Sequence, residues 1–156
     1  MVLTGSMRPP SAIGSDAPAN FINAIRVAAA ADSRGMGVLT ILNDEIQSAR
    51  DVRKGNTYRT DTFHSGEFGI LGYADADAIV YYHAPERRHT VSSEFRVDAN
   101  RELPRVQVLY VATASGAGLA SAAVQSGARG LVVAGTGAGS LGNLDSELAE
   151  IGRAHV

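Results

Sequence analysis

The chain has 156 residues, of which 45% are hydrophobic and 19% charged, so it is long enough for an ordinary domain with a real core and too apolar for a disordered chain. Lys and Arg number 14 against 16 Asp and Glu, giving a net charge of −2 without a basic block, which argues against a nucleic-acid partner. Cysteine is absent, which excludes disulfides, thiolate metal sites and thiol nucleophiles. No apolar run approaches the roughly 20 residues that a membrane-spanning helix needs, so we expect no membrane partner.

The first 42 residues have the order strand, loop, helix, strand. Residues 2–4 resemble the end of a buried strand, and Pro9 and Pro10 then impose a loop. Ser15 or Asp16 can cap a helix that runs to about residue 31. Its apolar residues recur at helical spacing, at Phe21, Ala24, Ile25 and Ala28. The run 38–42 predicts a strand buried on both faces of a parallel sheet. This βαβ order predicts an α/β fold.

The middle of the chain is more polar. Residues 44–65 predict a short hairpin followed by a loop, and residues 69–73 and 78–82 predict a β-hairpin. The next segment is charged, rich in turn residues and without a clear period, so we interpret residues 84–102 as a linker.

A second α/β unit follows the linker. It comprises a strand at 106–111, a helix at 119–125, a strand at 131–134, a glycine-rich turn at 135–140 and a helix at 141–150. We therefore expect two incomplete domains, at 1–83 and 103–150. The fold predicted is the rear part of a mostly parallel-sheet large domain with a hairpin, followed by the start of a smaller α/β domain.

The last six residues, 151–156, are what the bases ATCGGAAGAGCACACGTC encode, and these bases belong to a widely used sequencing adapter. We therefore expect this segment to be an adapter artefact and leave it out of the fold prediction. The nucleotide sequence tests this expectation, since any other codons would contradict it.

Lys54 is the leading candidate for chemistry. A lysine accepts a proton at neutral pH only if burial or a neighbouring charge lowers its pKa, and a paired carboxylate would then orient it for proton relay. Spacing alone favours a different interpretation, in which Lys54 is a solvated loop lysine.

The chain resembles the bacterial type II, or secreted-type, L-asparaginases over essentially residues 1–149. The segments that match in order and spacing are 7–9, 15–20, 43–54, 71–72, 89–90, 103–104 and 135–140. In that family a threonine attacks the side-chain amide of L-asparagine, ammonia leaves, and water hydrolyses the acyl-enzyme. A second threonine, an aspartate and a lysine relay the proton. The resemblance implies that Lys54 is this lysine, and that Ser6 lies where a backbone carbonyl and a small side chain line the pocket for the substrate amide.

Two essential segments of the family have no counterpart here. One is the Thr-Gly-Gly-Thr-Ile segment with the nucleophile, and the other is the His-Gly-Thr-Asp-Thr segment with the second threonine and the aspartate. The run Thr60-Asp61-Thr62 imitates the latter, but it follows Lys54 instead of preceding the 7–9 turn. We interpret it as a coincidence in a surface loop and expect the 156-residue chain to be inactive.

The resemblance also implies an assembly and a compartment. The intact parent is expected to be a homotetramer without a metal or an organic cofactor, located in the periplasm or secreted. The turn 135–140 reaches across a subunit interface in the family, where its last residue helps to hold the amino group of the substrate. Some members have asparagine there, whereas this chain has Ser140, so the preference between L-asparagine and L-glutamine stays open.

Two alternatives remain. Gly137, Gly139 and Gly142 satisfy G-x-G-x-x-G between a strand and a helix, which is typical of nucleotide-binding α/β modules, although a lone match is weak. The chain could also be an inert fragment that exposes interface surface and aggregates. The four histidines lack metal-ligand spacing, and we expect His89 to be a structural hydrogen-bonding residue.

Overall fold

The computed structural model describes residues 1–98, 100, 102–112 and 117–154, and it divides the chain into two compact units, Met1–Arg96 and Val97–Val156. The division falls inside the segment interpreted from the sequence as a linker. Within the described residues, no helix is long and apolar enough to cross a membrane.

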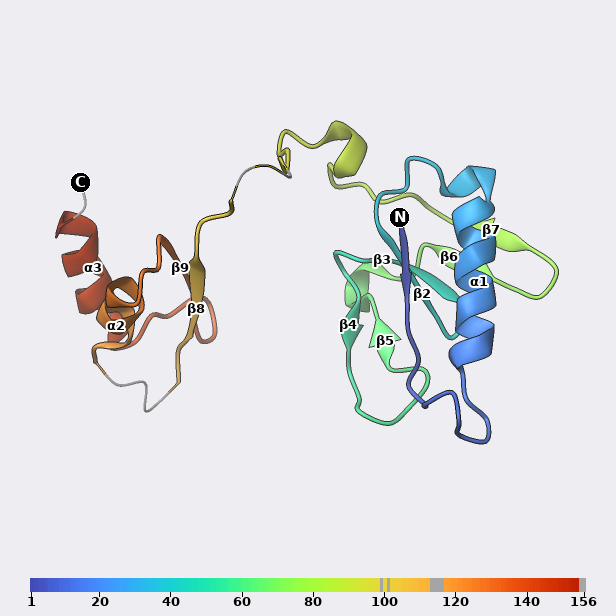
Figure 1. Ribbon diagram of the computed structural model, residues 1–156, viewed down its shortest axis with the longest axis horizontal. Helices are drawn as coiled ribbons and strands as arrows, with labels where there is room; N and C mark the ends of the chain where they lie inside the picture. The colour runs from blue at the N-terminus through green and yellow to red at the C-terminus, as the bar shows by residue number, and fades with distance from the viewer. Residues whose placement is uncertain (99, 101, 113–116, 155–156) are drawn as a thin grey trace. The chain divides into compact units, whose positions relative to one another are not determined.

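The first unit is built on a five-stranded mixed sheet with the order β1-β2-β3-β6-β7 (Figure 1). Its strands are β1 (Val2–Thr4), β2 (Leu39–Leu42), β3 (Glu45–Ser48), β6 (Gly72–Ala74) and β7 (Ile79–Tyr81). β1 pairs with β2 in parallel, and the other neighbours pair antiparallel. All four residues of β2 are buried, as the sequence predicts for this strand.

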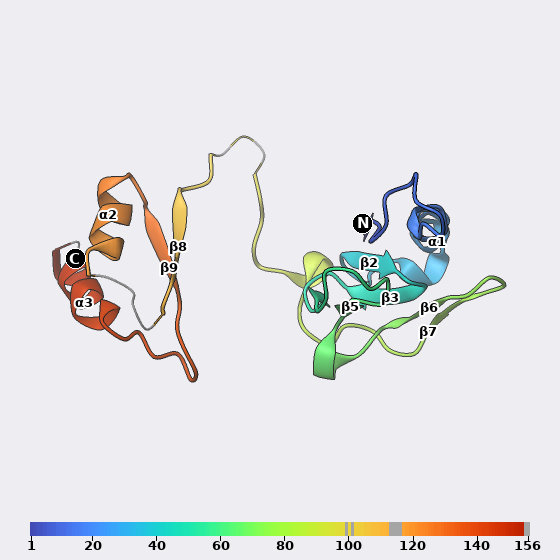
Figure 2. The same ribbon diagram turned by 90° about the horizontal axis from the view of Figure 1, so that it is seen from below.

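Helix α1 (Ala17–Ala29) confirms the predicted helix and covers one face of the sheet (Figure 2). The face it buries is not the one that the apolar pattern indicates, because the side chains of Phe21 and Ile25 are 62% and 55% exposed. Its buried residues are Asn20, Asn23, Ala24 and Val27. The helix therefore packs on the sheet through two small apolar residues and two asparagines. They join a core of Leu39, Ile41, Ile46, Leu71 and Ala74.

A two-residue turn joins β2 to β3. Asn43 and Asp44 have φ values of 52° and 62°, the conformation that a type I′ hairpin turn requires and that these residue types tolerate. The sequence interpretation missed β3, which is a central strand of the sheet. The short hairpin expected within 44–65 is present as a separate ribbon of β4 (Arg53–Lys54) and β5 (Phe63–His64).

The predicted second hairpin is confirmed, with shorter strands, as the pair β6 and β7. Its close strand approach depends on Gly72, because a Cβ atom there would collide with the carbonyl oxygen of Val80 and lie 2.9 Å from the Cα of Tyr81. The first unit, all of whose residues are described, also contains three short 3₁₀ helices: η1 (Ala31–Ser33), η2 (Gly66–Phe68) and η3 (Thr90–Ser92).

The second unit confirms the predicted strand-helix-strand order. Strands β8 (Val106–Tyr110) and β9 (Gly130–Ala134) pair in parallel, and the helices are α2 (Leu119–Gln125) and α3 (Leu144–Ala154). Both helices lie on the same side of the two strands (Figure 2). Their shared core consists of Leu109, Ala120, Ala123 and Leu144.

The final helix differs from its prediction at both ends. It begins at Leu144 instead of residue 141, because Gly142 has a φ of 56°, outside the helical region. It continues to Ala154, and Ile151 packs against the core of the second unit. Residues 155–156 lie outside the described residues. The adapter origin of 151–156 stays a prediction.

Candidate functional site

Ser6 lies two residues after the carboxyl end of β1, in an exposed loop. In open α/β sheets, ligands bind outside the carboxyl ends of the parallel strands. Because β1 and β2 are parallel, the carboxyl end of β2 lies at the same edge. The candidate site is therefore this edge, with Ser6 after one strand and the Asn43–Asp44 turn after the other.

Asn20 connects the two strand ends. Its side chain is 2% exposed, and its Nδ2 donates to the carbonyl oxygen of Gly5 at 3.0 Å. Its Oδ1 accepts from the backbone N–H of Asn43 at 3.0 Å. One amide group from α1 thus fixes the peptide before Ser6 and the first residue after β2.

Asp16 holds the loop that follows Ser6. Its carboxylate accepts the backbone N–H of Met7, at 2.9 Å for Oδ2, and that of Arg8 at 2.9 Å, and it accepts the Asn20 Nδ2 at 3.0 Å. Desolvation acts to raise the pKa of Asp16, but these donors favour the charged form and hold the pKa below its ordinary value of 3.8. Asp16 therefore binds the preceding loop as a carboxylate and makes no side-chain cap on α1.

A third contact ties α1 to the β2–β3 turn. The Nδ2 of Asn23 donates to Oδ1 of Asp44 at 2.7 Å, and the guanidinium of Arg26 donates to Oδ1 of Asn23 at 2.8 Å. The buried asparagines of α1 are thus the residues that shape the carboxyl edge. In the sequence, these asparagines could be recognised only as polar residues on the helix face that packs against the sheet. The spacing of the apolar residues indicated a different buried face, so the asparagines were not predicted as buried.

Lys54 lies on β4, where its side chain is exposed. Its Nζ lies 5.9 Å from the ring centroid of Phe63, the residue opposite it on β5, which is within the range of a cation–π contact. No acidic side chain among the described residues forms an ion pair with Lys54. The carboxylate partner that a relay lysine needs is therefore not supplied by the part of the chain that the structure describes.

The loop between β4 and β5 is closed by Thr62. The interpretation of Thr60-Asp61-Thr62 as surface loop is wrong for Thr62, which is 1% exposed. Its Oγ1 donates to the carbonyl oxygen of Asn56 at 2.6 Å and accepts the backbone N–H of the same residue. This threonine is occupied by the hydrogen bonds that shape its own loop.

Ser140 lies in the second unit, in an exposed turn after β9. The turn is closed by backbone hydrogen bonds from Thr136 to the Ser140 carbonyl oxygen at 3.1 Å and from Ser140 to the Thr136 carbonyl oxygen at 2.9 Å. Gly135 permits this closure, because a Cβ atom there would lie 2.8 Å from the backbone of Gly139.

The same turn differs from a dinucleotide-binding loop. Gly137, Gly139 and Gly142 all have positive φ values, of 53°, 95° and 56°. In the dinucleotide fingerprint, the glycine-rich turn leads directly into the helix whose N-terminus binds the pyrophosphate. Here the third glycine still belongs to the turn, since α3 begins at Leu144.

Of the predicted residues, Ser6 and Lys54 belong to the first unit and Ser140 to the second. In Figure 1 the loop after β1 and the loop joining β4 to β5 lie at the same end of the first unit. The structure thus places two of the three predicted residues in one unit.

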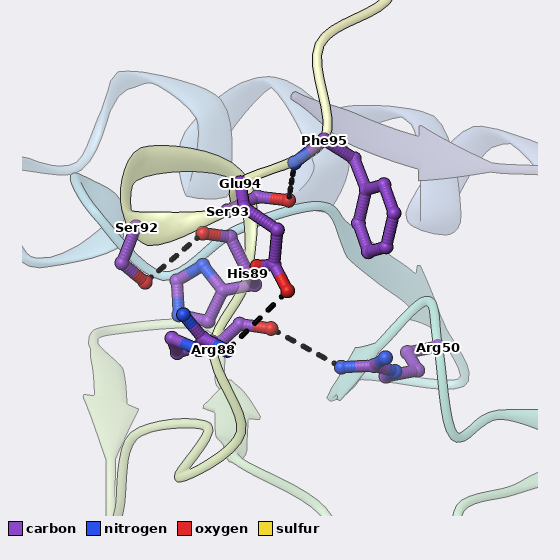
Figure 3. Close-up of polar contacts among 7 residues, drawn as sticks. All are labelled: Arg50, Arg88, His89, Ser92, Ser93, Glu94 and Phe95. Carbon is purple, nitrogen blue, oxygen red and sulfur yellow. Dashed lines mark hydrogen bonds and ion pairs between the residues drawn. The ribbon is translucent and has the colours of Figure 1, made fainter.

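A cavity of about 570 Å³ lies elsewhere in the first unit, lined by residues of segments 36–38, 48–51, 67–71 and 83–93. It lies beside the residues that precede β2, at the edge opposite to Ser6. Figure 3 shows two polar contacts beside this cavity. The Nη1 of Arg50 donates to the carbonyl oxygen of Arg88 at 3.2 Å, and the Nη2 of Arg88 forms an ion pair with the Oε1 of Glu94 at 3.3 Å. None of the predicted site residues lines it.

His89 contributes to the wall of this cavity. Its Nδ1 lies 3.3 Å from the Oγ1 of Thr90. Its carbonyl oxygen accepts the hydroxyl of Ser92 at 3.2 Å, as Figure 3 shows. The ring lies close to Gly37, where a Cβ atom would be 3.0 Å from Nδ1. These contacts fit the structural role that the sequence predicts for His89.

The structure is that of an α/β protein in which hydrogen bonds from α1 fix the loops at the carboxyl ends of two parallel strands. Comparison with known proteins shows which class this is. The family model "Asparaginase, N-terminal" matches residues 1–87, and the chain belongs to the asparaginase family.

The relatives agree with this assignment. The chain is 46% identical over 152 residues to L-asparaginase 2 of Bacillus subtilis, covering 97% of this chain and 39% of the relative. It is 38% identical over 141 residues to a probable periplasmic L-asparaginase of Haemophilus influenzae, covering 90% and 40%. The crystal structure of a probable cytoplasmic L-asparaginase from Campylobacter jejuni matches 98% of this chain and 51% of its own, at 37% identity and a TM-score of 0.90. The chain thus spans about two fifths of the length of these curated relatives.

Proposed function

We propose that this chain forms part of an L-asparaginase, which hydrolyses the side-chain amide of L-asparagine to L-aspartate and ammonia. The observation that carries the proposal is the family match over residues 1–87, which contain both Ser6 and Lys54. L-Glutamine is a second candidate substrate, because Ser140 replaces the asparagine found in some family members.

Each residue has one role in the proposal. The backbone around Ser6, held by Asn20 and Asp16, lines the pocket for the substrate amide. Lys54 relays a proton, with a threonine and an aspartate contributed by a segment that precedes this chain in a longer polypeptide. That segment also supplies the threonine nucleophile. A preorganised loop suits this chemistry, since a fixed backbone carbonyl and fixed amides need no rearrangement when charge develops.

The longer polypeptide is proposed to assemble as a homotetramer, with Ser140 reaching the site of a neighbouring subunit. It uses neither a metal nor an organic cofactor. Its domains correspond to residues 1–83 and 103–150. Relatives are named from both compartments, one periplasmic and one cytoplasmic; we propose the periplasm or secretion, which fractionation of cells expressing the complete gene tests.

The DNA upstream of Met1 gives the first test. A reading frame that continues upstream and encodes Thr-Gly-Gly-Thr-Ile supports the proposal, whereas a stop codon and a ribosome-binding signal directly before Met1 contradict it. The second test is ammonia release by the encoded protein from L-asparagine and from L-glutamine. Absence of release from both substrates overturns the proposed activity.

A further inference from the structure

We infer that Gln47 is the positioning residue for Lys54. Its buried side-chain amide fastens the β4–β5 ribbon, on which Lys54 lies, to the central strand of the main sheet. The inference deepens the proposed function and rests on it in one respect, because the position of Lys54 matters for catalysis only if Lys54 relays a proton.

The contacts of Gln47 use its whole amide group. Gln47 lies on β3 and is 1% exposed. Its Nε2 donates to the carbonyl oxygen of Phe63 at 2.7 Å and to Oε2 of Glu45 at 3.1 Å. Its Oε1 accepts the hydroxyl of Ser65, itself 4% exposed, at 2.7 Å. Two of these partners, Phe63 and Ser65, belong to β5 and the residue after it, so the amide holds the ribbon at two points.

The carbonyl of Phe63 needs such a partner. The register of the ribbon pairs Lys54 with Phe63, and the adjacent pair carries a ribbon hydrogen bond, from Gly55 to the Thr62 carbonyl oxygen at 2.8 Å. In an antiparallel ladder, hydrogen-bonded and non-hydrogen-bonded pairs alternate, so Lys54 and Phe63 form a non-hydrogen-bonded pair. The Phe63 carbonyl therefore points away from β4, toward Gln47.

The same geometry determines the surroundings of Lys54. Non-hydrogen-bonded pairs bring opposite side chains closer together than hydrogen-bonded pairs do, and the Lys54 Nζ lies 5.9 Å from the Phe63 ring centroid. A ribbon with two residues in each strand is marginally stable by itself. Contacts with the sheet must therefore fix its orientation, and Gln47 supplies such contacts as hydrogen bonds to Phe63 and Ser65.

The test uses the 156-residue chain, because Lys54 is its only lysine. Reductive methylation with ¹³C-formaldehyde labels this amine and the N-terminus, and a Lys54→Arg chain, which keeps only the N-terminal signal, identifies the signal of Lys54. In the unsubstituted chain we expect the Lys54 methyl signal to be shifted upfield by the Phe63 ring, and Phe63→Leu gives the reference without the ring.

Gln47→Leu is expected to move the Lys54 signal to the Phe63→Leu position. It is also expected to accelerate amide exchange at Gly55 by about tenfold or more, because the ribbon loses its tie to the sheet. Gln107→Leu, a strand glutamine of the second unit, is the matched control and is expected to change neither measurement.

A folded Gln47→Leu chain with the unsubstituted Lys54 signal and unsubstituted Gly55 exchange overturns the inference. Should this variant not fold, Ser65→Ala decides, since it removes one of the three contacts; a smaller change in the same direction supports the inference, and unsubstituted values overturn it. Neither measurement depends on turnover. Failure of the proposed amide hydrolysis in the longer protein is therefore distinguishable from failure here.

Discussion

Removing the side chain of Asn20 is expected to destabilise the first unit more than any other substitution of an asparagine in it. Asn20→Ala removes the donor to the Gly5 carbonyl oxygen and the acceptor of the Asn43 N–H. It also removes a donor to the Asp16 carboxylate. Neutral groups left without a partner cost about 1–3 kcal/mol each when buried. Gly5 and Asn43 are themselves exposed, so water recovers part of this cost. We therefore expect a loss of about 2–3 kcal/mol in the free energy of unfolding.

Urea unfolding followed by tyrosine fluorescence measures this change, since four of the five tyrosines belong to the first unit and the chain has no tryptophan. Asn100→Ala, at an exposed position of the second unit, is the control and should change the free energy of unfolding by less than about 0.5 kcal/mol. An Asn20→Ala chain as stable as this control would refute the reasoning that Asn20 joins the two strand ends.

Three further predictions concern single features of the fold. Because the pKa of Asp16 is lowered in the folded chain, its stabilisation is present above its unfolded pKa of about 3.8 and is lost as the pH falls through the lower folded value. Asp16→Asn should therefore be less stable than the unsubstituted chain at pH 7, and urea unfolding should show this difference shrinking as the pH falls below about 3.8. A difference independent of pH would contradict this. Gly72→Ala should cost about 3 kcal/mol or more in the same assay, because its Cβ collides with the facing strand, whereas Gly5→Ala, with open space around its Cβ, should cost less than about 1 kcal/mol. The double substitution of Val108 and Val132 by threonine should reduce aggregation in light scattering, because these side chains are 46% and 52% exposed. They alternate along β8 and β9 with residues that pack in the core with the helices, so they lie on the opposite face of the two strands. Unchanged aggregation would contradict the prediction that this face drives it.

Local sequence patterns were sufficient to predict most of the elements. The β-branched run at β2, the helix of α1 and the parallel strands of the second unit follow from composition and period, and the structure confirms them. Strand β3 was missed as a strand of the main sheet because its four residues alternate weakly and lie at the start of the polar segment 44–65, which was interpreted as a short hairpin followed by a loop. Both residues adopt the positive φ values of a hairpin turn, so this dipeptide was the available signal.

The packing face of α1 shows a second limit of periodicity. Phe21 and Ile25 fit a helical repeat, yet they are exposed, and Asn20 and Asn23 are buried in their place. A periodic pattern indicates that a helix is amphipathic, but it gives the buried face only when that face is apolar. Here the buried face must also satisfy the backbone groups at the ends of β1 and β2, and asparagine does so.

The site was predicted through family resemblance more than through local chemistry. Lys54 by itself resembles a solvated lysine, and its exposed position on β4 agrees with that description of its present surroundings. The sequence did not predict the supporting roles of Asn20, Asp16 and Gln47. Asn20 and Gln47 bind partners 15 or more residues away in the chain, and the role of Asp16 depends on the conformation of the loop after Ser6. Their signal is a polar residue at a position that the fold buries.

The most direct test of the account is the rate of ammonia release from L-asparagine by the longer polypeptide, compared between the unsubstituted protein and Lys54→Met. Arg53→Met, at the neighbouring exposed position of the same strand, is the control. We expect Lys54→Met to lower kcat by about 100-fold or more, as for a proton-transfer group, while Arg53→Met keeps most of the activity. A folded Lys54→Met protein that releases ammonia at the unsubstituted rate would contradict the account.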